Sequence, residues 1–300
     1  MTSGRVLTIV AMLVWAAVAL TAAPSAFSRH HSSRVPAATH AGAQSCSDIH
    51  MRFSDREVVT QSEERTVTKS EAPILHVHAH ANGGVYVEGW DQETYSVTLC
   101  KAAEDGPEAQ ATLDRMHITL QNGELGISTP GSDNRWAAHL IVRAPQSSAL
   151  EVEVSNGPLS FQHIDGSLKV SATNGPVTVS RCTGELELTA HNGPVVLEEN
   201  GGKESIRADN GPLTVSLSGD TWLGSGLEAH ASNGPVILKV PAGYRSGVVL
   251  ESEGSGPFQC RASVCAEGRK TWDEDRKRLE FGSGPTLVHV STVNGPVSVR

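Results

Sequence analysis

One short stretch, repeated with a fixed period, decides the fold of this chain. LEVEVSNGPLSF (150–161), LKVSATNGPVTV (168–179) and LELTAHNGPVVL (186–197) each hold Asn-Gly-Pro between two runs of alternating apolar residues. The first four copies of the tripeptide begin at residues 156, 174, 192 and 210, a constant step of 18 residues. The next steps, from 210 to 233 and from 233 to 255, are 23 and 22 residues long. Such a period is typical of repeat proteins whose units stack on one another.

The full set of tripeptides extends to the end of the chain. The six copies are Asn156-Gly157-Pro158, Asn174-Gly175-Pro176, Asn192-Gly193-Pro194, Asn210-Gly211-Pro212, Asn233-Gly234-Pro235 and Asn294-Gly295-Pro296. We interpret Ser255-Gly256-Pro257 and Ser283-Gly284-Pro285 as variants of the same unit. Apolar residues alternate with polar ones on both sides of each copy, which predicts strands with one buried face. A second glycine follows at 166, 184 and 202, so each repeat is predicted as strand, corner, strand, corner.

The residues of the tripeptide suit a sharp corner. Asparagine and glycine tolerate positive φ, and proline fixes its own φ and removes one backbone donor. An Asn-Gly hairpin, which would give an antiparallel meander, is the alternative. We favour a solenoid, in which each strand pairs in parallel with its copy about 4.8 Å away and the asparagine amides bond along the corner as a ladder. The predicted fold is therefore an all-β, parallel β-helix-like solenoid with about 18 to 23 residues per coil.

The chain also resembles a known family. The run AHLIVRAP (138–145) leads into LEVEVSNGPLSF, the chain closes on VHVSTVNGPVSV (288–299), and ILHVHAHANGGVYVEGWDQETYSVTL (74–99) contains a strand pair that ends in Gly-Trp-Asp. These features resemble the bacterial putative-adhesin domains of unknown function, the β-solenoid group with the toastrack and GIN-type heads. The resemblance covers roughly residues 70–300. It implies a β-solenoid with an adhesin-like role and no particular ligand.

Four segments precede or interrupt the repeats. Residues 1–28 carry one positive charge, an apolar run and small residues, which predicts a secretory signal peptide or, if it is not cleaved, a membrane anchor. Residues 29–45 are predicted to be a linker, and residues 46–145 an irregular β cap for the solenoid of residues 146–300. The charged stretch 259–281 breaks the period, and we interpret it as an insert that guards a sheet edge.

The charge of the chain narrows the class of partner. The sequence has 24 basic and 33 acidic residues, a net charge of −9. Residues 1–28 contain one basic residue, Arg5, and no acidic one, so removing them makes the net charge −10. We therefore expect no nucleic-acid partner, and contact with a membrane only through the N-terminal segment. The partner class left open is a cell-envelope, glycan or protein ligand.

Five cysteines are available for disulfides in an exported chain: Cys46, Cys100, Cys182, Cys260 and Cys265. The short spacing of Cys260 and Cys265 suggests a local disulfide, and a Cys46–Cys100 bond would tie the N-terminal arm to the first sheet. Cys182 would then stay unpaired. Spacing alone does not fix this connectivity.

Three histidines form a candidate metal site. His76, His78 and His80 alternate along one predicted strand, so their side chains share one face. Zinc or copper would suit such a set. Ligands two residues apart are about 7 Å apart on a straight strand, which is wide for one ion. A polar outer face is the simpler interpretation.

Two further patterns were weighed for function. Acidic residues are spread along the repeats, including Glu151, Glu153, Glu187 and Asp209, and clustering in one cleft would suggest a polysaccharide lyase or hydrolase. The residues before the asparagines form a row that would either bind a glycan or peptide or bond the local backbone. This row consists of Ser155, Thr173, His191, Asp209 and Ser232.

These patterns favour one function over two others. The prediction is an exported, periplasmic or surface-located, non-catalytic module for cell-envelope interaction or ligand sensing, with no cofactor. A carbohydrate-active β-helix enzyme and a histidine-based metal-binding protein are the alternatives. No nucleophile elbow, phosphate-binding loop or dinucleotide fingerprint occurs in the sequence.

Overall fold

The computed structural model describes residues 42–53, 57–131, 135–273 and 276–300, with the side chains of residues 80–82 left out. The predicted signal peptide and residues 29–41 of the predicted linker lie outside these residues, so both stay predictions. Within the described residues, no helix combines the length and the apolar character needed to cross a membrane.

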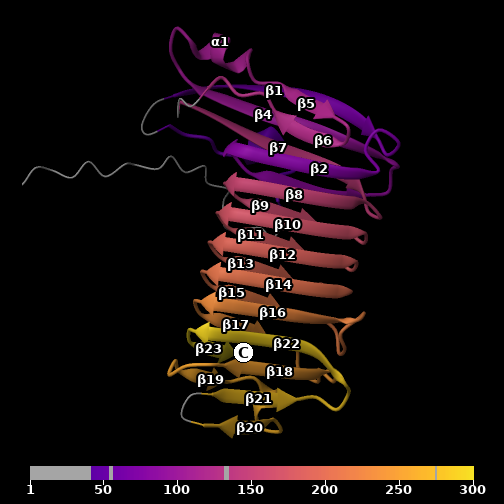
Figure 1. Cartoon of the computed structure of the whole chain (residues 1–300), viewed down its shortest axis with the longest axis vertical. Coiled ribbons are helices and arrows are strands. Elements are labelled where there is room, and N and C mark those ends of the chain that lie inside the picture. The colour runs from indigo at the N-terminus through magenta and orange to yellow at the C-terminus, as the bar shows by residue number, and fades with distance from the viewer. Residues whose placement is uncertain (1–41, 54–56, 132–134, 274–275) are drawn as a thin grey trace, which may run out of the picture. The chain divides into compact units, whose positions relative to one another are not determined.

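Two sheets of stacked strands form the described part of the chain (Figure 1). The twelve-stranded sheet, here called sheet A, contains in stacking order β5 (Ile118–Gln121), β6 (Glu124–Ile127), β2 (Ile74–Asn82), β8 (Ala149–Asn156), β10 (Ser167–Asn174), β12 (Glu185–Asn192), β14 (Lys203–Asn210), β16 (Gly226–Asn233), β22 (Thr286–Asn294), β18 (Gly247–Ser252), β21 (Lys277–Phe281) and β20 (Arg269–Trp272).

The eleven-stranded sheet, here called sheet B, faces it. Its strands, in stacking order, are β1 (Val58–Thr68), β4 (Thr94–Glu104), β7 (Trp136–Pro145), β3 (Val85–Trp90), β9 (Leu159–Gln162), β11 (Val177–Ser180), β13 (Val195–Glu198), β15 (Leu213–Ser216), β17 (Val236–Lys239), β23 (Val297–Val299) and β19 (Phe258–Cys260). Three short helical elements complete the described structure: α1 (Ala109–Leu113) and the 3₁₀ turns η1 (Cys46–Asp48) and η2 (Ser263–Cys265).

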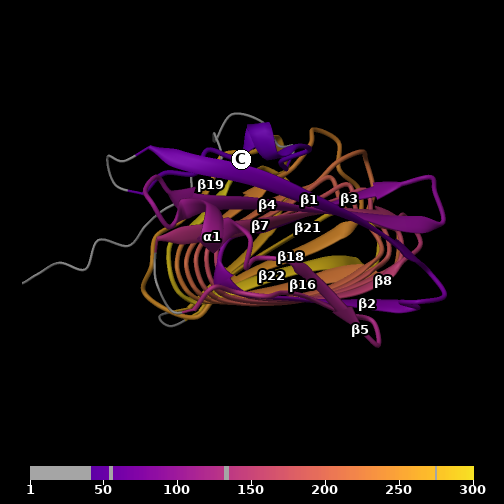
Figure 2. The same cartoon turned by 90° about the horizontal axis from the view of Figure 1, so that it is seen from above.

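The predicted solenoid is confirmed. Each repeat contributes one strand to each sheet, and every such strand pairs in parallel with its copy in the next coil. The asparagines align in register, as in Asn156–Asn174–Asn192. Figure 2 looks down the stack and shows the coils nested behind one another, with the core between the two sheets.

The core follows from the alternation of apolar residues. Inward positions of sheet A, such as Val152, Val170 and Leu188, meet inward positions of sheet B, such as Val177 and Val195, and all are at most 2 % exposed. Each coil is too thin to bury these side chains alone, so the stack supplies the apolar burial that stabilises it.

The corner asparagines form the predicted ladder. Each amide donates to the side-chain oxygen of the previous corner, over 3.0–3.3 Å, from Asn174 to Asn156 and so on to Asn294 and Asn233. Positive φ occurs at the glycine of these corners and not at the asparagine. Asparagine is therefore needed for the ladder, and glycine for the bend.

We expect Asn192→Ala to lower the free energy of unfolding by about 1–2 kcal/mol, because it removes a residue that bonds on both sides of the ladder. Asn192 Nδ2 donates to Asn174 Oδ1 and to Thr173 O, and its Oδ1 accepts from Asn210. Urea unfolding measures the effect. Asn294→Ala is the matched control, because Asn294 is described with a single ladder bond, to Asn233. Equal losses in the two variants would contradict a cooperative ladder.

The boundary between cap and solenoid differs from the prediction. Residues 74–90 already form a coil: β2 pairs with β8, Asn82 aligns with Asn156, and Gly83-Gly84 replaces Gly-Pro at the corner. Only β1, β4, β5, β6, β7 and α1 lie outside this coil at the N-terminal end. Sequence reasoning missed the coil because its corner lacks proline, which was the most distinctive residue of the motif.

The order of the last coils was also predicted wrongly. The C-terminal coil, β22 and β23, inserts between β16/β17 and β18/β19, so the stack does not follow the sequence at this end. Ser255-Gly256-Pro257 is a true corner that lies against Asn294-Gly295-Pro296, since Val297 N donates to Pro257 O over 2.9 Å. Ser283-Gly284-Pro285 precedes β22 and is not such a corner.

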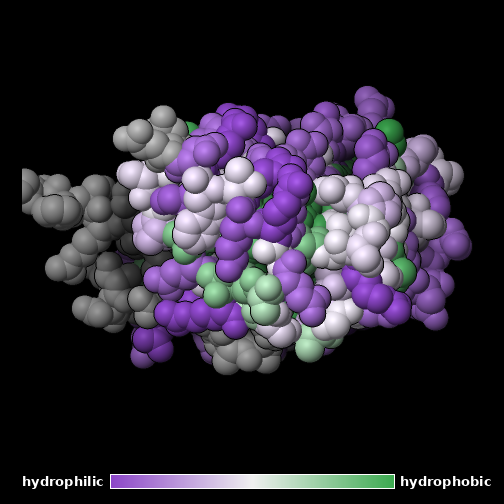
Figure 3. Space-filling view, turned by 90° about the horizontal axis from the view of Figure 1, so that it is seen from below, coloured by the Kyte–Doolittle hydropathy of each residue, from purple (hydrophilic) through white to green (hydrophobic). Residues whose placement is uncertain are grey.

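The predicted insert 259–281 ends the stack. It contains the last residues of β19, then η2, and then β20 and β21, which extend sheet A by antiparallel pairing with β18. Trp272 is 52 % exposed and packs against Phe258, with ring centroids 5.9 Å apart. Seen from this end, apolar surface gathers near the centre and hydrophilic residues surround it (Figure 3).

Candidate functional site

The outer face of sheet B is divided into a covered and an uncovered part. Residues 42–53, here called the arm, cover β3, β4 and β7, where Ile49, Met51 and Phe53 form a small apolar cluster with Tyr86 and Ile141. The Cys46–Cys100 disulfide, with Cα atoms 5.4 Å apart, fixes the arm to β4. The arm begins at Gly42, which lies against Ser160 of β9, so the strands beyond β9 are left uncovered.

The uncovered part carries a column of small and β-branched side chains, here called the shelf. The shelf consists of Thr178, Val196, Thr214, Ile237 and Ser298, which are in register on β11, β13, β15, β17 and β23. All five are half-buried. Because the residues on either side of each one point into the core, the shelf is a flat surface on a rigid support.

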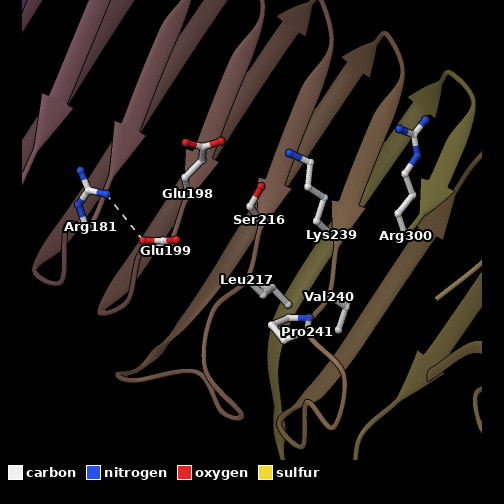
Figure 4. A pocket seen from close by; sticks show the side chains of 9 residues that line it. All are labelled: Arg181, Glu198, Glu199, Ser216, Leu217, Lys239, Val240, Pro241 and Arg300. Atoms are coloured by element: carbon white, nitrogen blue, oxygen red, sulfur yellow. Dashed lines mark ion pairs between the residues drawn. The ribbon is translucent and has the colours of Figure 1, made fainter. Parts of the chain in front are cut away.

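A hollow of about 520 Å³ opens beside the shelf, where the strands of sheet B end. Figure 4 shows the residues that line it. They are Arg181, Glu198, Glu199, Ser216, Leu217, Lys239, Val240, Pro241 and Arg300. The floor is apolar and the walls are charged, so the hollow combines the two surfaces that ligand sites usually have.

The acidic side of the hollow is already compensated. Arg181 Nη1 lies 3.8 Å from Glu199 Oε2, and Arg181 Nε donates to His163 Nε2 over 2.9 Å. Glu198 also has a partner within the protein. The cross-coil set of His163, Arg181 and Glu199 shares a positive φ, which repeats at every eighteenth residue. The acidic wall is thus held in place by the protein itself.

The predicted corner row does not behave as local backbone chemistry alone. His191 Nδ1 and Asp209 Oδ2 are 2.7 Å apart in neighbouring coils, and Arg207 Nε lies 3.2 Å from Asp209 Oδ1. The backbone oxygens of Thr173 and His191 accept from the ladder amides. This part of the row is an exposed ion-pair cluster at a corner, with no cavity described around it.

The candidate metal site remains untested as a whole. His76 and His78 lie on the outer face of sheet A beside carboxylates: His76 Nδ1 is 3.4 Å from Glu151, and His78 lies between Glu124 and Glu153, at 2.5 and 3.4 Å. The side chain of His80 is outside the described residues. Among the side chains that are described, no group of three or more His, Cys, Asp or Glu is placed to hold an ion.

The acidic residues weighed for catalysis do not converge. Glu153 aligns with His78 and Ser171, whereas Glu187 aligns with Lys169 and Ser205, so the two carboxylates belong to different columns of sheet A. In the described residues, these carboxylates are separated by neutral or basic side chains on one flat face.

Disulfides and buried polar residues complete the survey. Cys260 and Cys265 form the second disulfide, with Cα atoms 5.8 Å apart, and Cys182 is free and buried. Burial raises the pKa of the Cys182 thiol to about 12, so it stays protonated at neutral pH. Burial lowers the pKa of His139 to about 4, and its Nδ1 accepts from Gly84 N over 2.9 Å. Both residues are structural here.

Sequence reasoning missed the cationic wall of the hollow. Lys239 and Arg300 each stand four residues after a corner proline, at 235 and 296, and Glu198 and Ser216 occupy the same position in other repeats. Reading this position along the repeats would have revealed the column. The prediction instead concentrated on the residue before each asparagine.

Comparison with known proteins gives similarity of fold. No protein-family model matches the chain, and no curated protein sequence matches it. A structure described as a putative cell adhesion protein from Clostridium sporogenes matches with 10% identity and a TM-score of 0.32, over 80% of this chain and 99% of its own. A putative adhesin from Bacteroides fragilis matches with 13% identity and a TM-score of 0.41, over 81% of this chain and 97% of its own.

A third structure, described as a putative lipid binding protein from Parabacteroides distasonis, has 8% identity and a TM-score of 0.36. It covers 80% of this chain and 96% of its own. The chain is thus an all-β solenoid whose structural neighbours include putative adhesins, the family that its sequence resembles. At these TM-scores the neighbours leave its function to be inferred from its own surface.

Proposed function

We propose that this chain is an exported, non-catalytic, adhesin-like module that binds a polymer of the cell envelope or cell surface through the shelf. The supporting observation is the flat, uncovered column that continues across five coils of sheet B. The same face is closed by the arm in the first coils. Export rests on the N-terminal segment predicted from the sequence.

The construction of the stack suits binding rather than movement. Every coil is fixed to the next by two parallel strand pairings and by the asparagine ladder. A surface held this way loses little conformational entropy when a ligand binds. Its repeat of about 4.8 Å between strands offers equivalent contacts to successive units of an extended polymer.

The opposite face is less suitable for this role. The outer face of sheet A carries many charged side chains, and cross-strand pairs such as Lys203–Glu185, at 2.6 Å, occupy part of it. A ligand there would have to displace contacts that the protein already makes. The shelf carries no charged residue, so its hydroxyl and methyl groups are available to a polar polymer with apolar patches.

The test uses the purified full chain and immobilised polymers: polygalacturonate, neutral dextran and peptidoglycan. We expect measurable binding to at least one of them, and at least tenfold weaker binding for Thr178→Gln/Thr214→Gln, which breaks the flat surface without changing the charge. The matched control, Thr189→Gln/Ser205→Gln, alters the outer face of sheet A and should bind like the parent. Failure to bind any polymer, equal effects of both variants, or release of shortened polymer would overturn the proposal.

A further inference from the structure

The hollow beside the shelf has an excess of positive charge in an otherwise acidic protein. Lys239 and Arg300 line it, and both are exposed. We propose that this hollow binds the anionic group of an acidic polysaccharide, with Lys239 and Arg300 as its ligands. The inference deepens the function proposed above and rests on it, because it assigns a ligand class to the same face.

The two cations are brought together by the inserted C-terminal coil. Arg300 N donates to Leu238 O and Val240 N donates to Arg300 O, both over 2.9 Å, which places Lys239 and Arg300 side by side on β17 and after β23. Arg261 continues the column after β19, since its N donates to Val299 O over 2.9 Å. Neighbouring strands are about 4.8 Å apart, so three cations follow one another at that spacing.

This arrangement does not stabilise the fold. Like charges directly opposite each other on adjacent strands repel. Arg300 Nε and Arg261 Nη2 donate to neutral groups, Ser298 Oγ and Gln259 Oε1, and Lys239 makes no described ion pair. An anion bound between them would relieve the repulsion and accept charge-assisted hydrogen bonds, which are about twice as strong as neutral ones.

The other wall excludes a cationic ligand as the better fit. Glu199 is paired with Arg181, and Glu198 has its own partner. The charge left without an opposite partner in the described hollow is therefore positive. A carboxylate or sulfate group fits this wall, whereas an amine would have to compete with Arg181.

The rest of the hollow favours a sugar over a simple anion. Leu217, Val240 and Pro241 provide an apolar floor, against which the C–H face of a sugar ring can pack (Figure 4). Ser216 Oγ lies between Glu198 and Lys239 and has no hydrogen-bond partner among the described residues. It can bond a sugar hydroxyl. A volume of about 520 Å³ lies within the usual range for small-ligand sites.

The experiment measures binding of the full chain to three soluble polymers: polygalacturonate, which carries carboxylates, dextran sulfate, which carries sulfates, and neutral dextran. We expect the acidic polymers to bind at least tenfold more tightly than dextran, and the preference to shrink as salt is raised. Lys239→Ala/Arg300→Ala should lose at least tenfold in affinity for the acidic polymers. Comparing carboxylate with sulfate identifies which anion the site prefers.

Lys203→Ala/Arg207→Ala is the matched control, because it removes one lysine and one arginine from β14 on the opposite sheet. It should keep the affinity of the parent chain. Equal binding of neutral and acidic polymers, or equal losses in the two double variants, would overturn the ligand assignment. If Thr178→Gln/Thr214→Gln abolishes binding while Lys239→Ala/Arg300→Ala does not, the binding module stands and the anionic site fails.

Discussion

The variant Gly193→Ala is expected to unfold at a much lower urea concentration than the parent, with a loss of roughly 5 kcal/mol in the free energy of unfolding. Gly193 has φ of 136°, a region that residues with a side chain rarely adopt. A Cβ at this position would lie 2.2 Å from the carbonyl oxygen of Gly175 in the preceding coil. The two coils would have to separate.

The loss is large because the corner is shared between coils. Gly193 N donates to Asn210 O, and Gly175 N donates to Asn192 O, both over 2.9 Å. Moving one corner weakens these backbone bonds and the amide ladder together. Backbone strain contributes about 1–3 kcal/mol and the weakened hydrogen bonds contribute the rest.

Gly106→Ala is the control for this prediction. Gly106 lies in a turn near α1, and a Cβ added there would meet no atom within 4 Å. Its stability should change by less than about 0.5 kcal/mol. If Gly193→Ala is as stable as Gly106→Ala, the corners do not stack as described.

The second large effect is a gain: Glu204→Gln should be more stable than the parent by about 3 kcal/mol at pH 7. Glu204 lies on β14 at an inward position, in register with Leu186 and Leu227, and is 3 % exposed. Neither side-chain oxygen has a hydrogen-bond partner among the described residues. Burial raises the pKa of this carboxyl group from 4.5 to about 8, and the nearby Asn200 lowers it by less.

The sign of the pH dependence follows from this shift. Between pH 4.5 and about 8 the folded state holds a proton on Glu204 that the unfolded state has released. Stability therefore falls by about 1.4 kcal/mol for each pH unit across that range. Below pH 4.5 both states are protonated, and this contribution is fully present. Glutamine does not titrate, so the variant lacks the decline.

Urea unfolding at pH 4.5, 6, 7 and 8 measures the effect. The difference between the variant and the parent should be near zero at pH 4.5 and should widen with pH. Glu187→Gln, at an exposed position on β12, should leave the pH profile within about 0.5 kcal/mol of the parent. Parallel profiles for Glu204→Gln and the parent would show that the carboxyl group is not buried in solution.

The comparison of prediction and structure is informative at particular residues. The step of 18 residues correctly indicated that Leu168 and Leu186 would stack, because each residue meets its copy in the next coil. The same register places Glu204 in this column, yet the acidic residue was passed over because a polar residue was expected to face solvent. The strand β1 was missed because VVTQSEERTVT shows no clear alternation.

The candidate site was predicted only in part. The two disulfide pairs suggested by the cysteines are present in the structure. The shelf and the hollow were not predicted, because their identity depends on what covers each face. The arm closes one half of sheet B, and nothing in the spacing of residues 42–53 shows where that segment packs.

The sequence by itself determined the coil: its period, its two strands, its corner and the side chains that enter the core. It could do so because these features depend on contacts between a residue and its nearest copy, which the repeat already fixes. Only the tertiary structure decided where the arm lies, where the first coil begins and which coil follows β17. Those choices depend on competition among open sheet edges and apolar faces far apart in the chain, and the same competition brought Arg300 beside Lys239 instead of Arg261.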